Sequence, residues 1–514
     1  MSLAAVLVAI FGVLTAALAL FIATERCAYA RRRQRTAGSG SNSNNAQVVS
    51  IGIFHPYADG GGGGERVLYC ALIALVKRFS RLNAAVSESS TLAKPRYSLQ
   101  LILYSGDDGL TPEKLVANAA ELFNLPELVE LGVARCLTLV PLTKRDLLEP
   151  SQYPRFTLLW QSVAQIQLAL EAFDESRKRG LYPQLWLDTL GCPFSYLVAS
   201  LRYGCTVATY THFPMISTDM IDKVRQRGRG FNNDAAVTNS FSRSLVKYVY
   251  YRLFAAAYGA VGRYCTDVVM VNSTWTHNHI QSLWGKKPRI VHPACSTMHE
   301  FVEFDLEHRE PMALSIAQFR PEKNHLLQLQ AVKVLVAEHA DEMASRFRDF
   351  KLVLLGGCRT AEDYNRVEIL KSQAIDMGIR DRVEFAVNAS FADMKALMRR
   401  SSIGLHTMYN EHFGISNVEL MAAGTVLIAN NSGGPRFDIV KPGAGFLASS
   451  AAEYADKMWT VLTAEPVALT QMHRAARDSS LRFSDEQFED EFLEAMDDAL
   501  FGSAHGGAGK MKTK

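Results

Sequence analysis

Short apolar runs alternate with amphipathic stretches along most of the chain, a pattern typical of parallel sheets covered by helices. The apolar runs predict strands at Val48–Phe54, Leu99–Tyr104, Pro183–Asp188, Cys205–Thr209, Met312–Gln318, Leu352–Gly357, Val383–Val387, Ile403–Thr407 and Thr425–Asn430. The amphipathic stretches predict a helix from Glu65 and later helices at Phe391–Arg400, Ala451–Thr463, Pro466–Phe483 and Ser484–Phe501. Because strands and helices alternate in both halves, we expect an α/β protein with two doubly wound, Rossmann-like domains facing a cleft.

The first residues of the chain depart from this pattern. Ser2–Thr24 has no charged residue and, as a helix, is long enough to cross the roughly 30 Å apolar core of a bilayer. Basic residues follow it at Arg26, Arg31, Arg32, Arg33 and Arg35. The positive-inside rule therefore predicts one transmembrane anchor with a lumenal N-terminus and a cytosolic remainder. A cleaved signal peptide is the alternative, because alanines stand near the end of the segment.

The chain has 514 residues, which are enough for two full domains. Changes in composition along it predict the boundaries of the domains and linkers. We expect an anchor at 2–24, a basic juxtamembrane segment and flexible linker at 25–46, a first domain at 47–293, an interdomain linker at 294–310, a second domain at 311–483, a helix packing back on the first domain at 484–503 and a flexible basic tail at 504–514. The apolar, aromatic stretch Lys247–Val261 is expected to be either a buried helix or one resting on a membrane surface.

The overall composition is that of an ordinary globular enzyme, with 48% hydrophobic and 21% charged residues. The formal net charge is only +3 and the basic residues are spread out, which argues against nucleic acid as the main partner. The eight cysteines occur singly and show no metal-ligand spacing. Buried free thiols in a reducing compartment are the favoured interpretation.

The most specific motif lies between the last two predicted strands. Glu411 is expected in a loop beyond a strand end and Glu419 inside the following helix, with Ser-Gly-Gly-Pro at 432–435. If both glutamates were helical, eight residues would separate them by about 12 Å, whereas a retaining glycosidase needs about 5–5.5 Å. The two carboxylates could instead hold two polyol groups of one elongated ligand.

The helix between these glutamates is expected to begin with Ser416 or Asn417 as its cap and to end at Gly424. The amides at a helix N-terminus suit a phosphate group, because they carry a partial positive charge. The amides expected to face such a ligand are those of Phe413, Gly414 and Ile415.

Two basic residues follow the strand at Met312–Gln318. Arg320 and Lys323 are three residues apart at a helix start marked by Pro321, so they should share one face and point toward a sugar diphosphate. Surface charge on a helix is the alternative interpretation of each. No Asp-x-Asp follows a strand, so we expect no metal or other cofactor, and the cations must come from the protein.

Two further loops follow strands in the first half. Gly60–Gly64 lets the backbone approach a ligand closely, with Gly62 and Gly63 as donor-binding candidates. A dinucleotide-binding loop is the alternative, but the next predicted strand lies nearly forty residues on and offers no suitably placed acidic residue. His212 lies just after the predicted strand Cys205–Thr209, three residues beyond its end. Loops in this position often carry function.

The pattern Glu-x-Phe-Gly-Ile-x-x-x-Glu, followed by Ser-Gly-Gly-Pro, resembles the signature of the retaining nucleotide-sugar glycosyltransferases of the GT-B fold, family four. The segment Tyr-Thr-His-Phe-Pro-Met-Ile-Ser-Thr-Asp at 210–219 is similar to a motif of the α-1,2-mannosyltransferases of the endoplasmic reticulum in that family. Phe213 stands where that motif has a second tyrosine. The likeness extends over roughly residues 48–485.

This resemblance implies retaining transfer of the fourth and fifth mannoses from GDP-mannose to a dolichol-diphosphate-linked oligosaccharide, in α-1,2 linkage, at the cytosolic face of the endoplasmic reticulum. By the same resemblance, Glu411 approaches the donor sugar and Glu419 the ribose, whereas His212 orients the sugar or the acceptor. Arg320 and Lys323 hold the diphosphate, at a spacing one residue shorter than in some members. Other mannosyltransferases of the pathway are implied as partners.

Three alternatives to this function stay open at this point. The chain could be another lipid-linked nucleotide-sugar transferase, or a transferase-like scaffold without turnover. The third alternative, a nicotinamide-dependent epimerase, is disfavoured by the missing acidic residue.

The expected mechanism is a front-face displacement, because no well-placed nucleophile is visible. The leaving phosphate oxygen would accept the proton of the acceptor.

Overall fold

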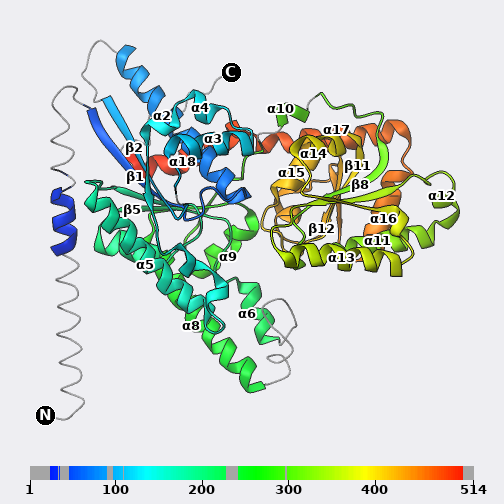
Figure 1. The fold of residues 1–514 in the computed structure, drawn as a ribbon, viewed down its shortest axis with the longest axis horizontal. Coiled ribbons are helices and arrows are strands. Elements are labelled where there is room, and N and C mark those ends of the chain that lie inside the picture. Colours follow the sequence, from blue (N-terminus) through cyan, green and yellow to red (C-terminus); the bar gives the residue numbers. More distant parts are fainter. Residues whose placement is uncertain are drawn as a thin grey trace. The chain divides into compact units, whose positions relative to one another are not determined.

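The computed structural model describes residues 24–32, 34, 46–88, 96–107, 109–226, 241–295, 298–301 and 303–501. The chain divides into two compact units. The first comprises Met1–Val271, Thr276–Val291 and Glu489–Lys514, and the second comprises Asn272–Trp275 and His292–Phe488. Each unit contains one parallel sheet with helices on both faces (Figure 1), as the alternating pattern predicts.

The first unit is built on a seven-stranded sheet in the order β3-β2-β1-β4-β5-β6-β7. Its strands are β1 (Ala46–Phe54), β2 (Arg96–Ser105), β3 (Leu137–Pro141), β4 (Leu185–Asp188), β5 (Thr206–Thr211), β6 (Val268–Val271) and β7 (Arg289–Ile290). The strands predicted at β1, β2, β4 and β5 are confirmed, whereas β3, β6 and β7 were not predicted. These three lie toward the two edges of the sheet, where short strands give a weak apolar signal.

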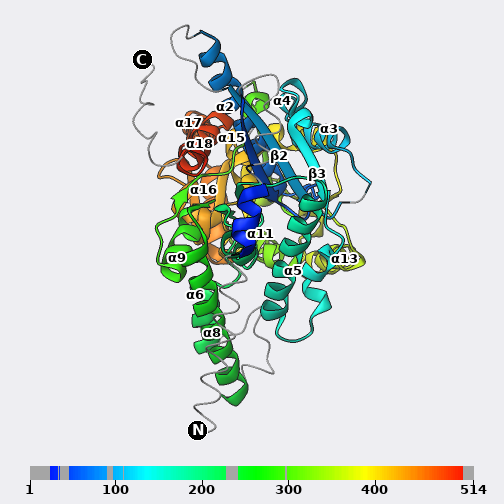
Figure 2. The same cartoon turned by 90° about the vertical axis from the view of Figure 1, so that its left-hand side faces the viewer.

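The α-helices that the structure describes between β1 and β7 are α2 (Gly63–Glu88), α3 (Pro112–Phe123), α4 (Glu127–Glu130), α5 (Thr157–Lys178), α6 (Thr218–Arg225), α8 (Phe241–Cys265) and α9 (Thr274–Trp284). An aromatic stack centred on Trp186 fills the space between the sheet and α5, with Phe54 5.2 Å and Phe173 4.9 Å from it between ring centroids. The long α8 extends away from the sheet, with α6 beside it (Figure 1 and Figure 2).

The helical segment at residues 24–32 is packed onto the first unit (Figure 2, dark blue). Tyr29 is buried, and its hydroxyl donates to the carbonyl of Pro183 at 3.0 Å. Its ring contacts those of Phe173, Tyr182 and Tyr203 at centroid distances of 5.0–5.9 Å. The first residues after the expected anchor are therefore held against the domain.

The C-terminal helix α18 (Asp485–Phe501) also belongs, from Glu489 onward, to the first unit. Lys77 of α2 forms an ion pair with Glu489 at 2.6 Å, and Arg78 pairs with Asp497 at 3.0 Å. Figure 1 shows α2 and α18 in the same unit. The helix α2, whose start was predicted at Glu65, runs to Glu88.

The second unit has a six-stranded sheet in the order β10-β9-β8-β11-β12-β13. Its strands are β8 (Glu310–Ile316), β9 (Lys351–Gly356), β10 (Val383–Val387), β11 (Ser401–His406), β12 (Val426–Asn430) and β13 (Gly445–Ala448). All but β13 were predicted. Its helices are α10 (Met298–Phe301), α11 (His325–Glu338), α12 (Ala340–Ala344), α13 (Ala361–Asp376), α14 (Phe391–Arg400), α15 (Ile415–Ala422), α16 (Ala451–Leu462) and α17 (Pro466–Ser480).

Alternate residues of these strands enter two separate cores, because successive side chains of a strand point to opposite faces. Leu352 and Leu354 pack with α11, α13 and α16, whereas Val353 and Leu355 pack with α14, α15 and α17. The two helix groups lie on opposite sides of the sheet (Figure 1). Phe301 and Phe304, from the stretch expected to link the domains, are buried in the second of these cores.

Within the part of the chain that the structure describes, no helix has the length and apolar character needed to span a membrane. The expected anchor at 2–24, apart from Thr24, lies outside the described residues, as do residues 35–45 of the expected linker and the tail at 504–514. The eight cysteines are all free and six of them are buried, as their scattered positions predict.

Candidate functional site

Each sheet has one place where the strand order reverses. The chain moves outward from β1 to β2 and β3 and then returns to the other side of β1 with β4. The second sheet repeats this scheme, with β8 between β9 and β11. In open parallel sheets, ligands bind beyond the carboxyl ends of the strands at such a point. The loops after β1 and β4, and those after β8 and β11, are therefore the candidate sites.

In the second unit, this topology brings Lys323 and Glu411 together. Lys323 ends a short 3-10 helix (Pro321–Lys323) after β8, and Glu411 lies in the loop after β11. The Lys323 Nζ lies 2.5 Å from Glu411 Oε2 and 3.2 Å from the sulfur of Met408. Two residues that lie 88 positions apart in the sequence thus form one ion pair.

A network of buried hydrogen bonds holds the loop that carries Lys323. The Thr407 hydroxyl lies 3.0 Å from the carbonyl of Lys323 and 3.1 Å from that of Asn324. The Gln328 amide donates to the Thr407 hydroxyl at 2.9 Å and to the Ser315 hydroxyl at 3.0 Å. Because Gln328 and Thr407 are buried, these bonds fix the loop to the sheet and give Lys323 a defined position.

The Glu411 carboxylate is buried and ionised. Burial by itself would raise the pKa of Glu411, but His406 and Lys323 outweigh it and hold that pKa well below its usual range. His406 Nε2 lies 3.3 Å from the same oxygen, Oε2, that Lys323 contacts. Burial, reinforced by His406 and Lys323, also lowers the pKa of His325 to about 4, so that imidazole is neutral at pH 7.

The loop around Glu411 is held by the Ser-Gly-Gly-Pro segment after β12. The Ser432 hydroxyl accepts the amide of Asn410 at 2.8 Å, and the Gly434 amide donates to the carbonyl of Glu411 at 2.7 Å. A Cβ on Gly433 would lie 2.2 Å from that same carbonyl oxygen. Glycine is therefore required by the close approach of the two backbones, and the Ser-Gly-Gly-Pro segment holds the backbone of Glu411 in place.

The helix that carries Glu419 begins two or three residues earlier than predicted. Its N-cap is Gly414, with φ of 91°, and neither Ser416 nor Asn417 takes this place, so that prediction is wrong. Only a residue without a Cβ adopts such a backbone readily, and a Cβ there would also lie 2.5 Å from the Asn417 amide. The predicted end at Gly424 is confirmed, with φ of 84° after the last turn.

The other predicted residues of this unit lie around the Lys323–Glu411 pair in different settings. The Phe413 ring is buried against His292 and Phe483, so its side chain anchors the loop and leaves only its backbone for a ligand. Ile415 opens the helix and Glu419 is half-buried within it. Arg320 is exposed.

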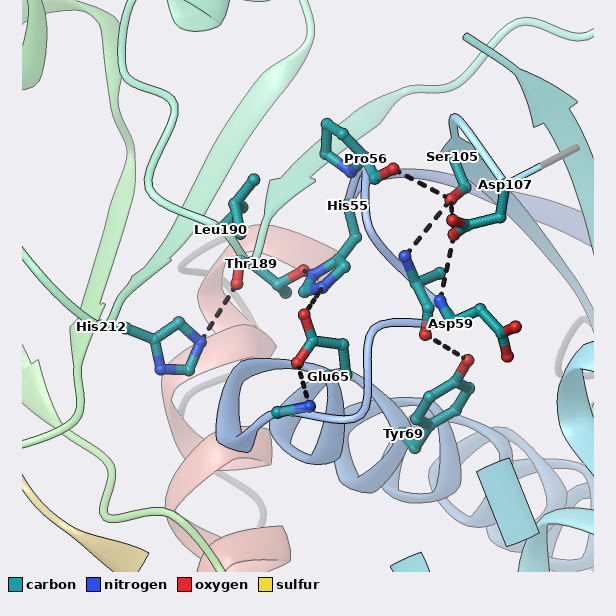
Figure 3. A network of polar contacts seen from close by, with 12 residues as sticks. His55, Pro56, Asp59, Glu65, Tyr69, Ser105, Asp107, Thr189, Leu190 and His212 are labelled. Atoms are coloured by element: carbon teal, nitrogen blue, oxygen red, sulfur yellow. Dashed lines mark hydrogen bonds and ion pairs between the residues drawn. The ribbon is translucent and has the colours of Figure 1, made fainter. Parts of the chain in front are cut away.

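In the first unit, the glycine-rich loop closes around the carboxylate of Glu65 (Figure 3). Glu65 Oε2 accepts the Gly62 amide at 2.7 Å, and Oε1 lies 3.7 Å from Nε2 of the buried His55. Burial by itself would raise the pKa of Glu65, but His55 and the Gly62 amide hold it below its usual value. A Cβ on Gly60 or Gly62 would lie within 2.9 Å of a Glu65 oxygen, so this carboxylate occupies the concave side of the loop.

His212 follows β5 and lies close to the same glycine-rich loop, which follows β1. Its Nε2 lies 3.1 Å from the carbonyl of Thr189, which follows β4, and the Thr189 hydroxyl lies 2.8 Å from His55 Nδ1 (Figure 3). A Cβ on Gly64 would lie 3.5 Å from the His212 ring. The structure thus brings His212 together with the loop that carries Gly62 and Gly63, of which Gly63 is exposed.

Sequence reasoning did not single out His55, Glu65, Thr189 or His406. His55, Thr189 and His406 are polar residues at or directly after a strand end, the position that identified His212. Glu65 lies in the first turn of α2. In the sequence, His406 lies within a predicted buried strand and gives no separate signal. The structure shows that it is indeed buried. Within the described residues, no group of three or more histidine, cysteine or acidic side chains could hold a metal ion.

Comparison with known proteins adds a family to this geometry. Residues 48–284 match the family model "ALG11 mannosyltransferase N-terminus", and residues 299–479 match "Glycosyl transferases group 1". The chain is 41% identical over 480 residues to the mouse GDP-Man:Man(3)GlcNAc(2)-PP-Dol alpha-1,2-mannosyltransferase, covering 91% of this chain and 90% of the mouse protein. It is 40% identical over 477 residues to the human protein of the same name, with 91% and 90% covered.

Solved structures share the fold at much lower sequence identity. A glycosyltransferase from Rickettsia africae has a TM-score of 0.54 and 15% identity, over 88% of this chain and 99% of that chain. A sucrose-phosphate synthase from Thermosynechococcus elongatus has a TM-score of 0.55 and 15% identity, over 87% and 98%. Two parallel-sheet, Rossmann-like domains are therefore the fold of this chain, as the sequence predicts.

The ion pair at the centre of the second unit predicts a pH-dependent loss of stability in Lys323→Met. The pKa of Glu411 is depressed by folding, so this group contributes stability above the unfolded value of about 4.5 and loses it as the pH falls. Without the ammonium, the buried carboxylate should lower the stability at pH 7 by roughly 3–5 kcal/mol. The deficit should shrink at pH 5, where the variant carboxylate takes up a proton.

Apparent melting temperatures of the wild type and Lys323→Met at pH 7 and pH 5 measure this effect. Lys457→Met is the matched control, because Lys457 pairs with Asp456 on the surface of the same unit. A deficit that is equal at both pH values would show that Lys323 stabilises the fold through packing and not through its charge.

Proposed function

Because the chain belongs to the family of GDP-Man:Man(3)GlcNAc(2)-PP-Dol alpha-1,2-mannosyltransferases, we propose that it transfers mannose from GDP-mannose to a dolichol-diphosphate-linked oligosaccharide. The transfer forms α-1,2 bonds with retention of configuration and adds the fourth and fifth mannoses. The observation that carries this proposal is the buried Lys323–Glu411 pair at the reversal point of the second sheet.

The second unit supplies the groups that bind the donor in this proposal. Lys323 and the exposed Arg320 neutralise the diphosphate as the sugar–phosphate bond breaks, together with the amides of Gly414 and Ile415 at the start of α15. Glu411 holds mannose hydroxyls and Glu419 holds the ribose. Since these cations and dipoles belong to the protein, the reaction needs no metal.

The first unit supplies His212 and the glycine-rich loop. His212 is held by the carbonyl of Thr189, so its orientation is fixed before a substrate arrives. In the proposal it orients the sugar or the acceptor hydroxyl. The Gly62 amide already donates to Glu65, so the loop acts through its shape and its exposed member Gly63. The acceptor proton passes to the leaving phosphate oxygen in a front-face displacement.

We place the protein in the endoplasmic reticulum membrane, as a single-pass protein with a lumenal N-terminus and cytosolic catalytic units. The uncharged segment 2–24 and the arginines after it support this placement. Packing of Tyr29 on the first unit supports it further, because residues that directly follow the expected anchor are held against that unit.

An apolar surface on the first unit supports contact with the bilayer as well. The exposed residues of this surface come from two neighbouring helices, joined where the Leu159 amide donates to the Tyr250 hydroxyl at 3.1 Å. They are Phe156, Leu159 and Trp160 near the start of α5, and Leu245, Val246, Val249 and Leu253 of α8. Exposed arginines flank them and α8 contains no acidic residue, which favours an anionic lipid surface.

Transfer to a defined acceptor tests the proposed function. Purified protein with labelled GDP-mannose and a synthetic lipid-linked trimannosyl acceptor should add two mannoses, both removable by an α-1,2-specific mannosidase. An unchanged acceptor would indicate a non-catalytic scaffold. Turnover only with another donor or another lipid acceptor would indicate a different lipid-linked transferase.

The same assay tests the role of Lys323. Lys323→Ala should lower kcat by roughly 10²–10³, the effect of losing one group that stabilises developing charge. Lys457→Ala, the surface lysine control, should retain wild-type kcat. Near-normal turnover of folded Lys323→Ala would exclude its role at the diphosphate.

The apolar surface predicts a selective loss with membrane-bound acceptor. Val246→Glu combined with Leu253→Glu should lower transfer to dolichol-linked acceptor in vesicles by at least about tenfold, because charged side chains resist burial in lipid. Transfer to a water-soluble short-chain acceptor should be unchanged. Val129→Glu, on the exposed face of α4 in the same unit, is the control. Equal loss with both acceptors would show that α8 serves the active site or the fold instead.

A further inference from the structure

His406 is a buried imidazole whose Nε2 faces the Glu411 carboxylate. Its Nε2 lies 3.3 Å from Glu411 Oε2 and has no hydrogen-bond partner among the described residues. The residue is only 3% exposed. A buried polar nitrogen without a partner is rare in native proteins and requires an explanation.

The position of His406 is fixed by the sheet. It is the last residue of β11, and its carbonyl accepts the Tyr454 hydroxyl at 2.8 Å. The next residue, Thr407, is the one that fastens the Lys323 loop. Two successive residues at this strand end therefore serve the two partners of the ion pair, His406 facing Glu411 and Thr407 bonding to the backbone of Lys323.

A charge problem arises as soon as Lys323 binds a diphosphate. The ammonium now lies 2.5 Å from Oε2, and a diphosphate would draw its charge and its N–H groups away from that oxygen. Glu411 would then be a buried carboxylate with a weakened partner, which is strongly unfavourable. It would keep its position only if another donor took over Oε2.

We propose that His406 is a positioning residue for Glu411, whose Nε2–H takes over Oε2 when Lys323 turns to the donor diphosphate. This inference rests on the proposed donor-binding roles of Lys323 and Glu411. His406 touches neither the sugar nor the phosphate in this account. It acts by holding the carboxylate in place while the donor is bound, so that the hydroxyl contacts of Glu411 are retained at the moment of transfer.

Replacing His406 separates this role from packing. His406→Leu fills the space without a donor and should lower kcat for GDP-mannose by about tenfold to a hundredfold, the effect of losing a hydrogen bond to a charged group. His406→Gln places an N–H near the position of Nε2 and should recover most of the lost rate. A folded Leu variant with wild-type kcat would overturn the proposal, as would a Gln variant that is as slow as the Leu variant.

A second measurement tests the inference without any donor. In the Lys323→Met background, His406 is the remaining partner of Oε2 in this account, so His406→Leu should lower the melting temperature more there than in the wild type. Equal losses in the two backgrounds would overturn it. His339→Gln, in the same unit and stacked on Trp459, should give equal losses as the control.

These readouts also separate this inference from the proposed function. Wild-type protein that transfers no mannose would refute the function and leave the melting comparison as the test of His406. Active wild-type protein with an equally active His406→Leu variant would refute only the role of His406.

Discussion

The candidate site of the second unit depends on the buried negative charge of Glu411. A carboxylate removed from water is strongly destabilising unless cations and donors surround it. Glu411 has Lys323 at 2.5 Å and His406 at 3.3 Å, both directed at the same oxygen. The glycines at 433 and 434, the network of Thr407 and Gln328, and the helix start at Gly414 all serve to hold these groups in place. The same charge that needs stabilisation in the fold is the one available to bind sugar hydroxyls.

The parallel-sheet topology explains why distant residues converge. Lys323 and Glu411 follow two strands that are neighbours in the sheet but are separated by two other strands along the chain. In the first unit the loops after β1 and β4 meet in the same way, and they bring together His55, Glu65 and Thr189. Both units therefore place their polar groups where the strand order reverses, as the general rule for these sheets requires.

Most of the fold could be predicted from the sequence, because the central strands are apolar on both faces and stand out as continuous runs. The candidate residues Lys323, Glu411 and His212 could be placed because each follows such a run. The partners of these residues could not be predicted, since the sequence does not show which loops meet. The run of five glycines predicted a ligand cradle, but the structure fills its concave side with Glu65. The cap at Gly414 was missed because Ser416 and Asn417 are the more usual capping residues.

The central claim is that Lys323 and Glu411 act as one unit in donor binding and transfer. A double-mutant cycle on kcat/KM for GDP-mannose, with Lys323→Ala, Glu411→Gln and the combined variant, tests it most directly. If the claim is right, the combined variant loses about as much as the slower of the two single variants. If the losses of the two single variants multiply in the combined variant, the residues act independently and the account is contradicted.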